Sequence, residues 1–168
     1  GLPSKGRLKD KAISFFNDRG LKILQSEKER NYFGTIENKP NIKIIFLHAK
    51  EIIQRLGDGT LDMGVSGLDL LKESDKNLQG KINVQKKLDF GNANLVIAVP
   101  DDWIDVQTIA DLEEVSFDIR LKRNARLRVA TKYPNLTNDF LISKGVTQYK
   151  LIPSLGATET YPFIGSSE

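Results

Sequence analysis

Three segments of the chain place small, hydroxyl or basic residues between an apolar run and a predicted helix. They are PSKGRL at 3–8, TKYPNLT at 131–137 and SLGATE at 154–159. The N-terminus of a helix presents unpaired N–H groups and the positive end of the helix dipole, so each segment suits a phosphate. Lys5, Arg7 and Lys132 add positive charge there, and Thr131, Ser154 and Thr158 add hydroxyl donors.

A simpler interpretation applies to each of these segments taken alone. Ser4, Thr137 and Thr158 could be ordinary N-cap residues, each stabilising its helix by about 1 kcal/mol. Three such segments in one α/β chain favour a shared phosphate site, because an α/β fold brings the ends of its strands to one edge.

A fourth segment, GDGTLDMGVSGLDLL at 57–71, places Gly64 and Gly67 at the end of a predicted buried strand. Glycine at such a position permits close approach of a ligand. A tight turn into the next helix explains the same two glycines equally well.

Several kinds of site are excluded by residue type. The chain has no cysteine, and His48 is its single histidine, which excludes thiolate chemistry, a histidine-based triad and a multi-histidine metal site. Neither a P-loop nor a GxGxxG fingerprint is present. Residues that we interpret as packing, or as carboxylates without a catalytic pair, are Phe90, Trp103, Glu51, Asp62 and Asp69.

Charge and hydropathy argue against nucleic acid and membranes as partners. The 25 basic and 22 acidic residues give a net charge of +3, and the two signs are interleaved. Only RLKRNARLR at 120–128 resembles the basic stripe of a nucleic-acid site, and we interpret it as a solvated helix end and loop. No apolar run is long enough to span a bilayer and no signal peptide is visible, so the cytoplasm is the expected location.

Apolar periodicity predicts the elements that position these segments. Helices are expected at 8–20, 49–59, 68–75, 108–115 and 136–145, with one more helical element after 155. Strands are expected at 31–37, 42–48, 60–67, 127–133 and 147–154, with two extended runs over 82–100. This order predicts mostly parallel sheets with helices on both faces. We expect two α/β lobes, 1–94 and 95–168, that meet near 91–96 and hold a cleft lined by Lys5, Gly67 and Lys132.

Four ordered motifs carry a resemblance to a known family. GLPSKGRL, GDGTLDMGVSGLDLL, LDFGNANLVIAVP and RVATKYPNLTNDFLISKGV follow one another along nearly the whole chain. Together they resemble ATP phosphoribosyltransferase, the first enzyme of histidine biosynthesis. The resemblance implies a two-lobed fold similar to type II periplasmic binding proteins.

The resemblance also implies an activity and partners. N1 of the adenine of ATP would attack C1 of phosphoribosyl pyrophosphate, with Mg²⁺ on the departing pyrophosphate. The chain resembles the short form of the family, which lacks a regulatory domain. That form implies a homo-oligomer that also binds a separate subunit similar to histidyl-tRNA synthetase, and histidine should inhibit only the assembled complex.

The resemblance implies substrate-binding residues in five segments. In the first lobe these are Lys5, Gly6 and Arg7, which match the family's KGRL, the basic residue Arg30, and Asp62, Gly64 and Gly67, which match its D-x-G-x-x-G turn. In the second lobe they are Thr131, Lys132, Tyr133 and Pro134, which match its ATKYP, and the small-residue turn of Gly156, Ala157, Thr158 and Glu159. The chemistry needs positioning and charge stabilisation more than a strong base, so no catalytic acid or base is assigned.

The chain departs from the family pattern in three places. His48 stands where the family often has arginine, so a fixed charge there becomes titratable. FGNANL replaces the FG-x-C-R-L of many members. The family's main phosphoribosyl pyrophosphate loop is expected directly after GSSE, whereas this sequence ends at Glu168.

Two other functions compete with the enzyme. The same two-lobed fold could bind a nucleotide or another solute without turnover, and a basic nucleic-acid-binding domain would rest on residues 120–128 alone. The residues after Glu168 in the gene would separate the first of these from the enzyme.

Overall fold

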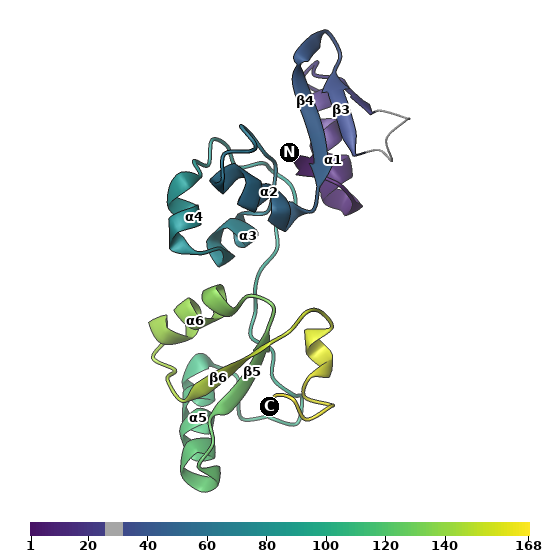
Figure 1. Cartoon of the computed structure of the whole chain (residues 1–168). Coiled ribbons are helices and arrows are strands. Elements are labelled where there is room, and N and C mark those ends of the chain that lie inside the picture. The colour runs from purple at the N-terminus through teal and green to yellow at the C-terminus, as the bar shows by residue number, and fades with distance from the viewer. Residues whose placement is uncertain (26–31) are drawn as a thin grey trace. The chain divides into compact units, whose positions relative to one another are not determined.

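The computed structural model describes residues 1–25 and 32–168. The chain divides into two compact units, Gly1–Asn94 and Leu95–Glu168. Both combine helices with a small sheet, so the predicted α/β class is confirmed at that level (Figure 1).

The first unit is built on a four-stranded sheet with the order β1-β4-β3-β2. β1 pairs parallel with β4, whereas β4 with β3 and β3 with β2 pair antiparallel. The elements of this unit are β1 (Leu2–Pro3), α1 (Gly6–Asn17), β2 (Ile23–Gln25), β3 (Phe33–Ile36), β4 (Lys39–Leu47), α2 (Ala49–Gly57), α3 (Leu68–Glu73) and α4 (Lys76–Lys81).

The prediction of a mostly parallel sheet is therefore wrong for the first unit. Only Glu37 and Asn38 separate β3 from β4, and Asn38 has a φ of 61°. A connection this short can join only antiparallel strands, because a parallel pair needs a crossover of about a dozen residues.

One face of this sheet packs against α1. Ala12 of α1 is fully buried in a cluster with Leu2, Ile36, Ile44 and Phe46. On the opposite face, Leu24 and Phe33 remain 42% and 46% exposed. Helices were predicted on both faces; the antiparallel part of this sheet instead leaves one face to solvent, as such sheets commonly do.

The segment 60–67, predicted as a strand, is not one. Its ladder-like hydrogen bonds involve the single residue Gly1, whose N-terminal amine donates to the carbonyl of Met63 (2.7 Å) and whose carbonyl accepts from the N–H of Val65 (3.0 Å). Residues 82–100 likewise form no strand. Extended sequence becomes a strand only where a neighbour pairs with it over several residues.

The second unit holds two parallel strands, which pair in register from Leu127↔Tyr149 to Thr131↔Pro153. Its elements are α5 (Ile109–Arg123), β5 (Leu127–Thr131), α6 (Pro134–Ser143), β6 (Tyr149–Pro153) and the 3₁₀ turn η1 (Thr158–Thr160). α5 is longer than the predicted 108–115, and its last turn contains the basic residues of the RLKR run.

The start of α5 is fixed by a capping box between Thr108 and Asp111. The Asp111 carboxylate accepts hydrogen bonds from the Thr108 hydroxyl and from the N–H groups of Thr108 and Gln107. These hydrogen bonds lower the pKa of Asp111. The box sets the helix start so that Leu112 and Ile119 enter the core.

The core of the second unit lies on one face of its sheet. The apolar residues that β5 and β6 contribute to this core alternate along the strands and so lie on one face; they are Leu127, Val129, Tyr149 and Leu151. The core residues of α5 and α6 pack against the same face. Arg128 points the other way, and its guanidinium pairs with Glu168 at 2.9 Å. The predicted helices on both faces are again not observed. The residues up to Glu168 lie beside β5, where the N–H of Glu168 donates to the carbonyl of Arg128 at 3.2 Å (Figure 1).

Among the described residues, no helix is both long and apolar enough to cross a membrane.

Candidate functional site

The carboxyl ends of β1 and β4 lie side by side in the first unit. The N–H of Ser4 donates to the carbonyl of Leu47 at 2.8 Å, which extends the parallel pairing by one residue. The chain then leaves β1 through Lys5, Gly6 and Arg7, which are all exposed. The predicted KGRL loop therefore starts at the same sheet edge as His48, which follows β4.

The shape of this loop depends on a glycine. Gly6 is the first residue of α1 and has a φ of 75°, a conformation that favours glycine. Lys5 is the N-cap residue, and within the described chain no side chain caps the helix. The positive end of the α1 dipole thus faces solvent together with Lys5 and Arg7, as an anion site requires.

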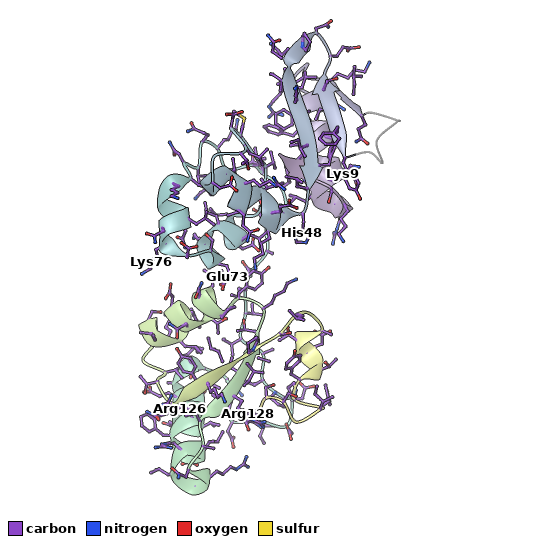
Figure 2. The ribbon with its side chains drawn as sticks, viewed as in Figure 1. Lys9, His48, Glu73, Lys76, Arg126 and Arg128 are labelled. Carbon is purple, nitrogen blue, oxygen red and sulfur yellow. The ribbon has the colours of Figure 1, made fainter. Side chains whose placement is uncertain are left out.

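His48 is the N-cap residue of α2 and is exposed (Figure 2). Its Nδ1 accepts a hydrogen bond from the N–H of Lys50 at 3.3 Å. The proton of the neutral ring must then be on Nε2, which leaves Nε2 as a donor toward solvent. In place of the arginine that the resemblance leads us to expect, this chain therefore has a histidine that caps α2.

The segment 62–67 follows the opposite side of β1 from β4. Its two hydrogen bonds to Gly1 have the pattern of a parallel pair. The hydroxyl of Ser66 donates to the carbonyl of Ala49 at 2.7 Å and so ties the segment to the start of α2. The structure therefore brings the 5–7 loop, His48 and this segment to one edge of the first unit.

Packing explains Gly64 without a ligand. A Cβ at Gly64 would lie 2.5 Å from Cγ2 of Ile52, so only glycine lets this segment lie against α2. Gly67 has a φ of −73° and is the N-cap residue of α3, while Asp62 is exposed. The ligand roles of these three residues stay predictions.

The parallel strands of the second unit bring the other two predicted loops together. Thr131 pairs with Pro153, and the N–H of Ser154 donates to the carbonyl of Thr131 at 2.9 Å. The segments 131–134 and 154–159 therefore leave the sheet at the same carboxyl edge, where ligands of α/β folds commonly bind.

Buried hydroxyl groups shape the first of these two loops. Thr131 is 6% exposed and Thr137 is 4% exposed, and their hydroxyls hydrogen-bond to each other at 2.8 Å. The Thr131 hydroxyl also accepts from the N–H of Tyr133 at 3.0 Å. The Thr131 hydroxyl thus contacts its own loop, and Lys132 is the exposed group between the two threonines. The predicted substrate contacts of Thr131 and Lys132 stay predictions.

The second loop contains an uncommon backbone conformation. Ala157 has a φ of 48°, in the left-handed region that residues with a Cβ seldom adopt. The hydroxyls of Ser154 and Thr158 lie 2.8 Å apart just beside it. Gly156 and Glu159 are exposed at the loop surface.

The simpler interpretation of these segments as ordinary caps is wrong. The N-cap residues of α1, α6 and η1 are Lys5, Tyr133 and Ala157, not Ser4, Thr137 and Thr158. α6 begins instead with Pro134, whose missing N–H costs nothing at that position. The roles of Thr137 and Ser154 in holding the loops were not predicted. For Ser154, a small hydroxyl residue at the end of a strand was the available signal.

Two further points concern the predicted residues. Arg30 lies outside the described residues. Among the residues that are described, no group of three or more His, Cys, Asp or Glu side chains is arranged to hold a metal ion. The prediction that loops of both units line one cleft stays a prediction.

Comparison with known proteins identifies the family. The family model described as HisG: ATP phosphoribosyltransferase matches residues 48–168. The chain belongs to the ATP phosphoribosyltransferase family. It is 46% identical over 167 residues to an ATP phosphoribosyltransferase of Nitrobacter winogradskyi and 42% identical over 168 residues to one of Brucella melitensis. Both alignments cover 99% of this chain.

The family members differ from this chain in length. The chain spans 51% of the Nitrobacter protein and 73% of the Brucella protein. Among solved structures, the ATP phosphoribosyl transferase (HisG:HisZ) complex from Thermotoga maritima matches with a TM-score of 0.61. That match has 23% identity and covers 99% of this chain and 68% of that one, and it supports a shared fold.

Proposed function

We propose that the protein transfers the phosphoribosyl group of phosphoribosyl pyrophosphate to N1 of ATP, the first step of histidine biosynthesis. The observation that carries the proposal is family membership: identities of 42–46% extend over 99% of the chain. The non-catalytic binding protein is not favoured, because these relatives carry the name of an enzyme.

The proposed reaction forms one bond and breaks one. N1 of adenine donates its electron pair to C1 of the ribose, and the C1–O bond to pyrophosphate breaks, with its electrons leaving on pyrophosphate. The transition state carries positive charge at the ribose and growing negative charge on the leaving group. Preorganised N–H donors and cations around that group are the appropriate catalytic elements.

The exposed cations at the sheet edges take the phosphate-binding roles in this proposal. Lys5 and Arg7 beside the start of α1 would bind phosphate oxygens, as would Lys132 between β5 and α6. His48 would donate from Nε2. Mg²⁺ would arrive on the pyrophosphate of the substrate, where it neutralises the developing charge.

The proposal extends to assembly, location and fold. The chain would form homo-oligomers and bind a regulatory subunit similar to histidyl-tRNA synthetase; the solved structure that shares its fold is named as a HisG:HisZ complex. Its two units would be the lobes of a fold similar to type II periplasmic binding proteins, in the cytoplasm. Light scattering that finds only monomer, with and without such a subunit, would contradict the assembly.

The activity is tested by mixing the protein with ATP, phosphoribosyl pyrophosphate and Mg²⁺, alone and with a synthetase-like subunit. Pyrophosphate and phosphoribosyl-ATP should appear in equal amounts. A matched control replaces ATP with 1-deaza-ATP, which has no N1 to attack and should give neither product. Binding of both substrates without either product, under both conditions, would support the non-catalytic alternative.

A further inference from the structure

Ser154 joins the two loops at the carboxyl edge of the second unit. It directly follows β6 and is 5% exposed. Its N–H donates to the carbonyl of Thr131, the last residue of β5, at 2.9 Å. Its hydroxyl lies 2.8 Å from the hydroxyl of Thr158 and 3.2 Å from the carbonyl oxygen of Gly156. One residue therefore contacts both predicted substrate loops.

These contacts surround the left-handed residue of the loop. Ala157 lies between Gly156 and Thr158, the two residues that the Ser154 hydroxyl contacts. On its other side, the hydroxyl and N–H of Thr160 both donate to the carbonyl of Ala157, at 2.8 and 3.0 Å. A non-glycine residue keeps a left-handed conformation only where its surroundings fix it, and the Ser154 hydroxyl is the buried part of those surroundings.

We propose that Ser154 is a positioning residue: its buried hydroxyl holds the 155–159 loop in the conformation that binds a substrate phosphate, at a fixed distance from the Lys132 loop. The inference rests on the proposed function for its substrate. Ser154 itself touches no substrate, since its hydroxyl is turned toward Gly156 and Thr158.

The test compares Ser154→Ala with Thr158→Ala and with the double variant. Each single variant should raise KM for at least one of the two substrates by about tenfold and change kcat by less than about twofold, because the hydrogen bond between the two hydroxyls is lost from the resting loop. The double variant should be no worse than Ser154→Ala, because the bond between the two hydroxyls is already lost in that variant. Ser154→Thr, which keeps the hydroxyl, should restore most of the affinity.

A matched control is Ser143→Ala. The Ser143 hydroxyl donates to the carbonyl of Phe140 at 2.7 Å within α6, away from both loops. This variant should leave KM unchanged. Additive effects of Ser154→Ala and Thr158→Ala, or an unchanged KM in both, would overturn the proposal.

Amide hydrogen exchange separates this proposal from the proposed function. Exchange at residues 155–160 should be faster in Ser154→Ala than in the wild type, in the absence of any substrate. If the wild type forms no product yet exchange responds in this way, the proposed function fails and the loop-holding role stands. Unchanged exchange would overturn the positioning role whatever the activity.

Discussion

The loops at the two sheet edges are held in shape by different interactions. In the first unit, the loop before α1 turns at Gly6, which has a φ of 75°, and none of the described side chains caps the helix. In the second unit, two pairs of hydroxyl groups shape the loops after β5 and β6. The first loop thus depends on the backbone freedom of glycine, and the second pair of loops depends on buried polar contacts.

This difference has consequences for how each loop responds to substitution. Glycine allows a left-handed φ that a residue with a Cβ adopts only under strain, so the first loop should be sensitive to an added Cβ at Gly6. A buried hydroxyl pair has two members, and removing one hydroxyl takes away the bond between them, which destabilises the loop.

The largest expected effect comes from the two cores. Phe46 is 1% exposed in the first unit and Leu141 is fully buried in the second. Phe46→Ala should reduce the free energy of unfolding by about 3–5 kcal/mol and Leu141→Ala by about 2–5 kcal/mol. Amide exchange should rise mainly in the unit that carries the change. An equal rise in both units for either variant would show that they unfold together.

A smaller effect is expected at the hydroxyl pairs. Thr137→Val keeps the shape of the side chain but removes the hydroxyl that contacts Thr131 at 2.8 Å. Because both residues are buried, urea unfolding should show a loss of about 1–3 kcal/mol. Ser14→Ala serves as the control, since its hydroxyl lies on the exposed part of α1 at 3.4 Å from Asp18. Equal stability of Thr137→Val and wild type would contradict the role of the pair.

Gly6→Ala should cost about 1 kcal/mol of stability, because alanine is strained at a φ of 75°. Beyond the local backbone, no described atom lies within 4 Å of the added Cβ, so collision with the rest of the described fold does not contribute. Gly156→Ala is the matched control: that site is equally open but has no left-handed φ. The contrast between the loops would be lost if the two variants had the same unfolding midpoint.

The smallest effect concerns pH and the Arg128–Glu168 pair. Burial raises the pKa of Glu168, but hydrogen bonds and charge from Arg128 outweigh it, so the pKa in the folded protein is lowered. The carboxylate therefore stabilises the fold at neutral pH, and this contribution declines below the ordinary glutamate pKa of about 4.3 and disappears below the folded pKa.

Glu168→Gln should therefore lower the melting temperature slightly at pH 7 and flatten its decline between about pH 5 and 3. The measurement is thermal unfolding of both proteins across that range. Parallel curves for the two would show that Glu168 does not contribute to the acid sensitivity.

Local sequence patterns were sufficient to predict most elements. The apolar periodicity of 49–59 gave α2, and the apolar runs at 42–48 and 127–133 gave the buried parts of β4 and β5. The pairing of the strands could not be predicted from these patterns. The two-residue turn at Glu37 and Asn38 makes β4 run antiparallel beside β3, whereas an apolar run carries no information on the direction of its neighbour.

The position of the candidate loops could also be predicted from the sequence. A hydroxyl or lysine between a strand and a helix indicated the loops at the sheet edges, and the structure has them there. Which hydroxyls face inward was not predictable, because Thr131 and Lys132 are adjacent and only the sheet pairing decides that Thr131 is buried. Substrate contacts at these loops stay predictions.

The central claim, that the exposed cations at the sheet edges bind substrate phosphates, is tested most directly by titrating ATP and phosphoribosyl pyrophosphate into Lys132→Ala. The control is Lys144→Ala, an exposed lysine at the other end of α6. Lys132→Ala should bind at least one substrate more weakly by about 1.5–3 kcal/mol, with a smaller difference at high salt and an unchanged melting temperature. Lys144→Ala should behave as wild type. Normal binding of both substrates by Lys132→Ala, with a melting temperature many degrees lower, would contradict the claim and make Lys132 a structural residue.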